Sequence, residues 1–122
     1  MSKQTAPAST WGDNCQGWTL VTTDRLHVMQ ERMPPQTDEV RHVHDQTRQF
    51  YYVLTGQALV EVADQTEPLR AGEGVQIPPG MPHQLRNPSH ARAIVVVVGG
   101  KGGYVGRDGR LVDGSAAPGA TR

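Results

Sequence analysis

The sequence predicts a single all-β domain, folded as a barrel or a sandwich. Fourteen glycines and nine prolines interrupt a chain of 122 residues, and short β-rich runs lie between them. No stretch combines a helical spacing of apolar residues with helix-capping residues. Many short strands at regular spacing are typical of all-β folds. A closed barrel also suits a hydrophobic content of 36% and a mean hydropathy of −0.52, because closure needs only a small interior.

The expected strands end at turn-like Gly and Pro residues such as Pro78-Pro79-Gly80 and Gly99-Gly100. The run Ile94–Val98 does not alternate between apolar and polar residues, so we expect it to be buried on both faces. The strands predicted in this way are Thr19–Thr22, Leu26–Met33, Gln49–Leu54, Ala58–Val62, Gly74–Ile77, His83–Arg86 and Ala93–Val98.

The two ends of the chain have little to bury. We expect residues 1–10 to form an arm that is disordered or packs on a neighbouring subunit, and residues 11–114 to form the barrel. Residues 115–122, Ser115–Arg122, read as a disordered tail. A modest core also favours pairing of two barrels, so a homodimer is expected.

Composition and charge exclude several classes of protein. Twelve basic residues balance twelve acidic ones, whereas a nucleic-acid-binding protein needs a basic surface. No apolar run approaches the roughly 20 residues that span a membrane, and the N-terminus has no signal-peptide character. Cys15 is the only cysteine, so no internal disulfide is possible. A cytoplasmic location is the simplest expectation.

Three of the five histidines have a spacing that suits a metal ion. His42 and His44 are two residues apart, and alternate residues of a strand point to the same face. His83 begins another predicted strand and can supply a third imidazole. Three histidines with open positions suit a catalytic divalent ion, which can be Zn, Mn, Fe, Ni or Cu.

The surroundings of these histidines resemble the two motifs of the cupin superfamily. The second motif, Gly-x5-Pro-x-Gly-x2-His-x3-Asn, matches at every anchor, and the first, Gly-x5-His-x-His-x4-Glu-x6-Gly, matches at its histidines and final glycine. The stretch from Gln36 to Asn87 carries the resemblance, which covers nearly half of the chain. The anchors are Gly72, Pro78, Gly80, His83 and Asn87 for the second motif, and Gln36, His42, His44, Gln49 and Gly56 for the first.

The resemblance implies a double-stranded antiparallel β-barrel, a jelly roll, that is often dimeric and holds one divalent metal ion in its mouth. It also implies that His42, His44, Gln49 and His83 occupy the four ligand positions. The cupin fold hosts isomerases, lyases, dioxygenases and binding proteins, so the family does not choose a reaction.

Two anchors of the first motif differ from the family pattern. Gln36 replaces a glycine, which suggests that the turn after Pro34-Pro35 avoids positive φ. Gln49 replaces a glutamate. An amide oxygen can bind a metal, but it is neutral and accepts no proton near neutral pH. A site of three imidazoles and one amide leaves a dication uncompensated and favours an anionic, chelating substrate. The alternative is that Gln49 does not touch the metal and three histidines hold it.

Strand alternation adds two candidate catalytic residues. If Gln49 points inward, so do Tyr51 and Val53, which makes Tyr51 a candidate for substrate binding or proton transfer. On Leu26–Met33 one face carries His27, Met29, Glu31 and Met33. If that face lines the pocket, Glu31 is a candidate general base, but alternation alone leaves the face open. His27 and His90 are not assigned to the site.

The leading hypothesis is a metal-dependent enzyme that acts on a small, anionic, oxygen-rich substrate by isomerisation or lyase-type proton transfer. The ligand set resembles that of the cupin of pectin breakdown that linearises unsaturated uronates. A metal-dependent dioxygenase is the rival enzyme, and a non-catalytic small-molecule-binding cupin is the rival outside enzymology.

Overall fold

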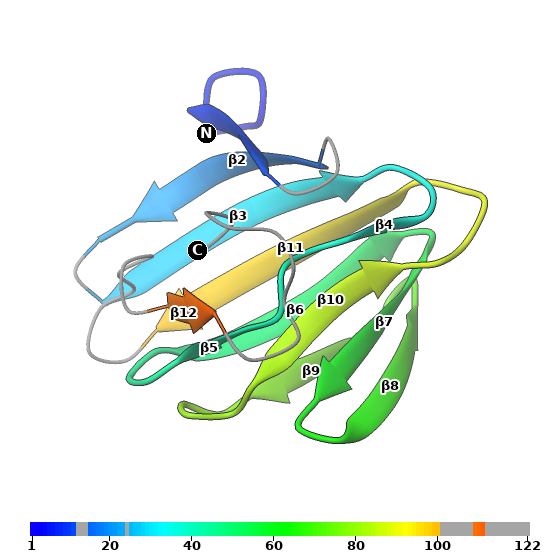
Figure 1. Ribbon diagram of the computed structural model, residues 1–122. Coiled ribbons are helices and arrows are strands. Elements are labelled where there is room, and N and C mark those ends of the chain that lie inside the picture. Colours follow the sequence, from blue (N-terminus) through cyan, green and yellow to red (C-terminus); the bar gives the residue numbers. More distant parts are fainter. Residues whose placement is uncertain (12–14, 24, 101–108, 112–122) are drawn as a thin grey trace.

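The computed structural model describes residues 1–11, 15–23, 25–100 and 109–111. Two antiparallel sheets of this part of the chain pack face to face (Figure 1). Sheet A has the strand order β1-β2-β3-β11-β6-β9, and sheet B has the order β12-β5-β10-β7-β8, with β4 also paired to β10. The described residues contain strands and no helix. The all-β fold of antiparallel strands that the sequence predicts is therefore confirmed.

The bounds of the strands follow the breaks in the sequence. Leu26–Met33 and Gly74–Ile77 are predicted to the residue, whereas five strands that lack an alternating apolar pattern are not predicted: β1, β4, β5, β8 and β12. The strands are β1 Ala8–Trp11, β2 Cys15–Thr22, β3 Leu26–Met33, β4 Thr37–Asp38, β5 His42–His44, β6 Arg48–Thr55, β7 Gln57–Val62, β8 Gln65–Arg70, β9 Gly74–Ile77, β10 His83–Asn87, β11 Ala93–Gly100 and β12 Gly109–Leu111.

The N-terminal arm contributes a strand to sheet A. Residues 8–11 form β1 and pair antiparallel with β2 of the same chain, in a register that places Ala8 opposite Trp18. The tail predicted at residues 115–122 lies outside the described residues. Within the described part of the chain, we find no helix with the length and apolarity needed to cross a membrane.

Alternation along the strands separates an inner from an outer face. On β6, Gln49, Tyr51 and Val53 are buried, whereas Phe50, Tyr52 and Leu54 are exposed, as the sequence predicts. Strand β11 differs from its prediction. Val95 and Val97 are buried, but Ile94, Val96 and Val98 on the other face are only partly covered. The reason is that no second layer of the described residues covers the outer face of sheet A.

The turn between β3 and β4 corrects a second prediction. Gln36 has a φ of 59°, so this turn does adopt the left-handed conformation that the family glycine would favour. A non-glycine residue in this region costs on the order of 1 kcal/mol or more. By contrast, the family glycine is present at position 56. Gly56 has a φ of 80°, and a Cβ there would lie 2.4 Å from the Arg92 carbonyl oxygen.

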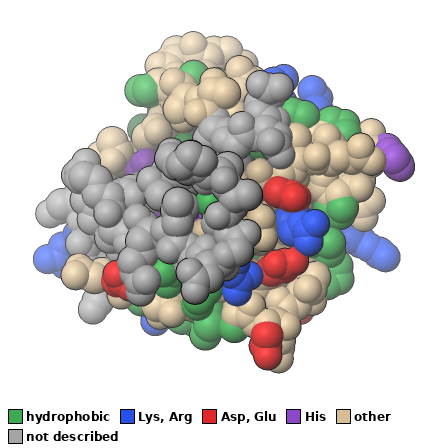
Figure 2. Space-filling model, viewed as in Figure 1, with side chains coloured by type: hydrophobic (Ala, Val, Ile, Leu, Met, Phe, Trp, Pro, Cys, Tyr) green, Lys and Arg blue, Asp and Glu red, His purple; other side chains and the backbone are tan. Residues whose placement is uncertain are grey.

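The outer face of sheet B is charged. Arg86 on β10 pairs with Asp38 on β4 at 3.2 Å and with Glu61 on β7 at 2.9 Å, and Arg41 lies 3.6 Å from Glu61. Figure 2 shows acidic and basic side chains next to one another on this side of the molecule. The two sheets therefore differ in what they present to solvent.

Candidate metal centre

Two neighbouring strands of sheet B bring the three histidines together. His42 and His44 lie at the two ends of β5, and His83 opens β10 directly opposite His42. Gly80, which has a φ of 78°, donates its N–H to the His44 carbonyl oxygen at 2.7 Å. This bond joins the turn before β10 to the strand that carries the other two imidazoles.

The three imidazoles form one buried cluster. Relative exposure is 0% for His42, 2% for His44 and 1% for His83. One nitrogen of each ring lies within 4.8 Å of the others. Opposite ligands of a metal ion with bonds of about 2.1 Å are about 4 Å apart. The cluster therefore has nearly the dimensions of a metal's coordination shell.

Backbone carbonyls fix the orientation of two of the rings. His42 Nδ1 lies 2.8 Å from the Val40 oxygen, and His83 Nδ1 lies 2.9 Å from the Met81 oxygen. A carbonyl oxygen only accepts hydrogen bonds, so each Nδ1 carries the proton. Each Nε2 then has a lone pair that can coordinate a metal ion, which is the arrangement found at histidines that bind metals.

His83 is held in its neutral form. Burial lowers the pKa of His83 to about 3, and the neighbouring His42 adds to this effect. A neutral imidazole is the form that binds a metal ion.

Gln49 places a second electron-pair donor beside His83. Its Oε1 lies 2.9 Å from His83 Nε2. Because the ring is neutral and its proton is on Nδ1, both atoms present lone pairs, and two lone pairs at this distance repel. A cation between them turns the repulsion into joint coordination, since ligand atoms of one ion lie about 3 Å apart. The donor set therefore fits a divalent metal ion. A rotated Gln49 amide, which donates N–H to Nε2, is the alternative that leaves the metal to three histidines.

Tyr51 connects this set to a carboxylate that the sequence did not reveal. The Tyr51 hydroxyl lies 3.5 Å from Gln49 Oε1 and 3.3 Å from Glu39 Oε1. Glu39 is buried, with 1% exposure, and its Oε1 lies 4.0 Å from His42 Nδ1. Glu39 sits in the connection between β4 and β5, where no periodic pattern could predict its direction.

The opposite wall is formed by β3 of sheet A. The face with His27, Met29, Glu31 and Met33 is buried, which answers the question that alternation left open. His27 pairs with Gly99 of β11, which in turn pairs with Gln49 of β6. These three residues form one row, in which the central position has no side chain.

Glu31 lies in a different row from the ligands. It pairs with Val95, which pairs with Val53, four residues along β6 from Gln49. Successive inward residues are about 6.6 Å apart along a strand. Glu31 is therefore about 13 Å further along the barrel than His27. Of these two titratable groups on β3, His27, which the sequence does not single out, lies nearer to Gln49.

The remaining motif residues have structural roles. The buried Asn87 amide donates to the backbone oxygens of Met33, Pro34 and Ala91 at 2.9–3.1 Å, which holds two turns together. His90 is exposed in the turn before β11. Cys15 is buried in the hydrophobic core.

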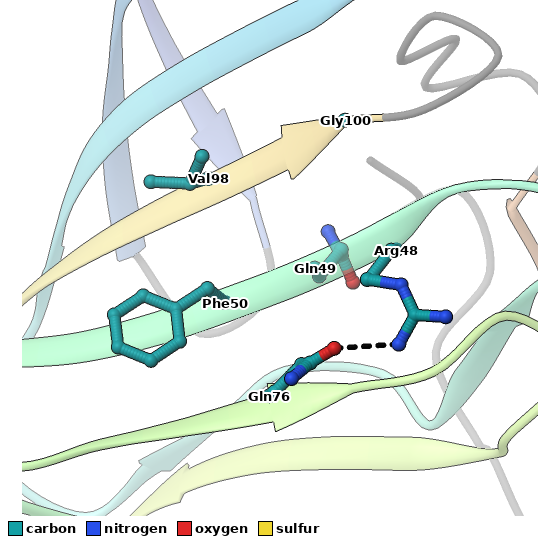
Figure 3. Close-up of a pocket in the computed structure, with 6 residues that line it drawn as sticks. All are labelled: Arg48, Gln49, Phe50, Gln76, Val98 and Gly100. Carbon is teal, nitrogen blue, oxygen red and sulfur yellow. Dashed lines mark hydrogen bonds between the residues drawn. The ribbon is translucent and has the colours of Figure 1, made fainter.

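A pocket of about 360 Å³ is lined by residues of β6, β9 and β11, and Gln49 is among them. Figure 3 shows that Phe50, Arg48 and Gln76 line it, and that Arg48 donates a hydrogen bond to Gln76. Outward-facing side chains form most of its walls, but it shares Gln49 with the candidate metal centre, and none of the three histidines lines it.

Comparison with known protein families gives one match that covers more than half of the chain. The family described as “Cupin domain” matches residues 29–99, a range that contains the three histidines and Gln49.

Similar proteins include a curated relative and two solved structures. The chain is 38% identical over 55 residues to “Polyketide synthase CurC” of Streptomyces cyaneus, a match that covers 45% of this chain and 36% of the relative. A predicted oxalate decarboxylase of Thermotoga maritima has a TM-score of 0.75 and 15% identity, covering 82% of this chain and 96% of that one. The polyketide cyclase RemF of Streptomyces resistomycificus has a TM-score of 0.69 and 21% identity, covering 82% and 77%. These structures share the fold, and the chain spans little more than a third of the curated relative.

Proposed function

Because this chain belongs to the cupin family, we propose that it is a metal-dependent enzyme that moves a proton next to a carbonyl group of an anionic, oxygen-rich substrate. The observation that carries this proposal is the buried cluster of three imidazoles, whose nitrogens lie within 4.8 Å of one another. A structural role alone does not require three buried imidazoles that share one point, whereas a metal centre does.

His42, His44 and His83 would hold the ion, with Gln49 as the fourth ligand. Such an ion supplies Lewis-acid chemistry, which makes a carbonyl-bound carbon easier to deprotonate. The protein's own contribution is to keep His83 neutral, to present the Gln49 oxygen beside it and to exclude water by burial.

His27 is the proton acceptor that the geometry favours. It lies on the inner face of sheet A, in the row of Gln49, and Gly99 between them has no side chain. An imidazole changes its protonation state near neutral pH and can both accept and return a proton. Tyr51 is a second candidate for substrate binding, and Glu31 stays a candidate base at a greater distance along the barrel.

A substrate with two neighbouring oxygens fits the site best. The enolate of a 1,3-dicarbonyl compound is a chelating monoanion, which suits a dication held by neutral ligands. The relatives named a polyketide synthase and a polyketide cyclase support a poly-β-ketone as the substrate, because its ring closures begin with removal of a proton between two carbonyls. We therefore favour cyclisation or isomerisation of such a chain over lyase chemistry on a sugar acid.

The test begins with the protein loaded with Zn²⁺ or Co²⁺. We expect about one equivalent of metal, and acetoacetate as a probe should change the visible spectrum of the cobalt protein. Deuterium exchange at C2 of acetoacetate, followed by NMR, should be faster with loaded protein than with free metal, and His27→Gln should slow it more than Glu31→Gln. A spectral change without faster exchange would indicate a binding protein. Oxygen consumption by the iron-loaded protein would instead support a dioxygenase.

We also propose that a second copy of this chain covers the outer face of sheet A. Charged side chains on the central strands β3, β11 and β6 are confined to the strand ends, at Arg32 and Arg48, and the centre is uncharged and, apart from Gln30, aliphatic and aromatic. Together with β2 and β9 this face measures roughly 20 by 26 Å. With the relief of its side chains it approaches the ~800 Å² that each partner buries in a standard interface.

A further inference from the structure

Glu39 is a buried carboxylate that belongs to neither the histidine cluster nor the matched motif anchors. It lies between β4 and β5, three residues before His42. A charged group in such a position is costly to bury unless hydrogen bonds and neighbouring charges compensate it. Its contacts therefore indicate what it does.

Strand β10 holds Glu39 in place through three hydrogen bonds. The Glu39 N–H donates to the Leu85 oxygen at 2.9 Å, and the Gln84 side chain donates to the Glu39 carbonyl oxygen at 2.8 Å. The Leu85 N–H donates to the carboxylate Oε1 at 2.9 Å. Because β10 begins with His83, Glu39 is fixed to the strand that carries this ligand.

On its other side the carboxylate meets sheet A. The Tyr51 hydroxyl has one proton, and Glu39 Oε1 at 3.3 Å is both the nearer and the stronger acceptor compared with the Gln49 amide oxygen at 3.5 Å. Oε1 therefore accepts from a backbone amide and from a phenol, and such hydrogen bonds favour the ionised form of a carboxylate. The same oxygen lies 4.0 Å from His42 Nδ1.

We propose that Glu39 is a positioning residue that supplies the negative charge which Gln49 lacks. This inference rests on the proposed metal site. A ligand set of three imidazoles and one amide is neutral, and in a buried site a dication needs an anionic partner. Glu39 provides that charge from behind the ligands, next to His42 and hydrogen-bonded to Tyr51, whose hydroxyl lies 3.5 Å from Gln49 Oε1. It also holds these side chains in their orientation.

The placement of this charge shapes what the site accepts. With one carboxylate close by, a divalent ion leaves a net charge of one, which a monoanion neutralises. The carboxylate lies on the side of β10 and the β4–β5 connection. The proposed site thus balances the charge of the ion with one internal carboxylate and one anionic substrate.

The substitution Glu39→Gln tests the charge by itself. The amide oxygen can still accept from Leu85 and Tyr51, so metal-free E39Q should keep the thermal unfolding temperature close to that of the wild type. Its Zn²⁺ affinity, measured by competition with a chelator, should fall about 10–100-fold, the range found when groups behind metal ligands are altered. Glu61→Gln is the matched control, since it removes the same charge from the outer face of sheet B, where Glu61 pairs with Arg86.

A double variant separates charge from structure. Adding Gln49→Glu to E39Q returns one carboxylate to the site at the ligand position, and we expect it to restore at least tenfold of the lost affinity. If the wild-type protein binds metal and E39Q binds it equally tightly, this inference is overturned and the proposed function is not. E39Q that unfolds more easily, with unchanged affinity of its folded form, also overturns it. Wild-type protein that takes up no metal overturns the proposed function together with it.

Discussion

The inner and outer faces of strand β6 share one backbone, but their side chains differ in polarity and in exposure to solvent. The inner residues Gln49, Tyr51 and Val53 are at most 2% exposed, whereas Phe50, Tyr52 and Leu54 are 40%, 36% and 45% exposed. The inner face contains a buried amide and a buried phenol, which contact His83 and Glu39. The outer face contains aromatic and aliphatic groups in contact with water. The large aromatic and aliphatic side chains of β6 thus lie on its outer face, which is incompletely buried.

Under the functions proposed above, the two faces of this sheet have separate roles. Buried polar groups are tolerated only with partners, and the inner groups have them in Glu39 and His83. Exposed aromatic clusters are rare on monomers and mark surfaces of association. Variants on the inner face should therefore alter metal binding and stability, and variants on the outer face should alter association.

The largest effect is expected at the metal ligands. His83→Ala should reduce metal content from about one equivalent to a background level, with an affinity loss of at least about 100-fold, because a direct ligand contributes more than groups behind it. His90→Ala, which changes an exposed histidine, should keep full metal content. Elemental mass spectrometry after dialysis measures both. Full metal content in a folded His83→Ala protein would contradict the site.

The two adjacent tyrosines give a matched pair for stability. Tyr51→Ala should lower the free energy of unfolding by about 3–5 kcal/mol, because it opens a cavity and removes the phenol from Glu39. Tyr52→Ala should lower it by less than about 1 kcal/mol, since its ring is partly in solvent. Urea unfolding of the metal-free proteins measures the difference. Equal losses would mean that the outer face is as constrained as the inner one.

Much of this division between faces could be predicted from the sequence, because side chains alternate in direction along any one strand, whatever it pairs with. It gave the directions of Gln49 and Tyr51, and it paired His42 with His44. It did not give Glu39, because the direction of a side chain in a β4–β5 connection depends on Leu85 and Tyr51, which are 46 and 12 residues away.

Two other residues show where local rules fail. His27 alternates with Glu31, but the sequence does not single it out, because the identity of the buried face depends on which strands pack against β3. Gln36 was expected to avoid positive φ, yet it has a φ of 59°. The hydrogen bonds of Asn87 to Met33 and Pro34 fix the chain just before this turn, and these tertiary contacts outweigh the preference of a single residue.

The pH dependence of stability tests the electrostatics of the inner face. The folded-state pKa of His83 is about 3, below its ordinary value of 6.5, so between these values the unfolded chain binds a proton that the folded chain does not. The stability contributed by neutral His83 is complete above pH 6.5 and decreases as the pH falls toward 3. The slope approaches about 1.4 kcal/mol per pH unit for one such group. Urea titrations of metal-free protein at pH 7.5, 6 and 5 should show this decrease.

The same titrations need a variant without the imidazole, because carboxylates also bind protons in acid. His83→Asn should flatten the decrease between pH 7.5 and 5, where few exposed carboxylates titrate. An identical slope in wild type and variant would mean that His83 is not kept neutral by its surroundings.

The smallest effect is expected on the outer face, where association and not folding should change. Phe50 is a suitable position because its ring is already held in place: a Cβ on Gly74 of β9 would lie 2.6 Å from it, so the ring rests directly over that glycine. A ring that is fixed before binding loses little entropy in an interface.

Phe50→Glu puts a charge at the centre of the apolar face and should raise the dimer dissociation constant at least tenfold, about 1.4 kcal/mol. Gln57→Glu adds the same charge to an exposed position of sheet B and should leave it unchanged. Sedimentation at several concentrations distinguishes the cases. A wild-type protein that stays monomeric at high concentration would show that this face does not bind a second copy.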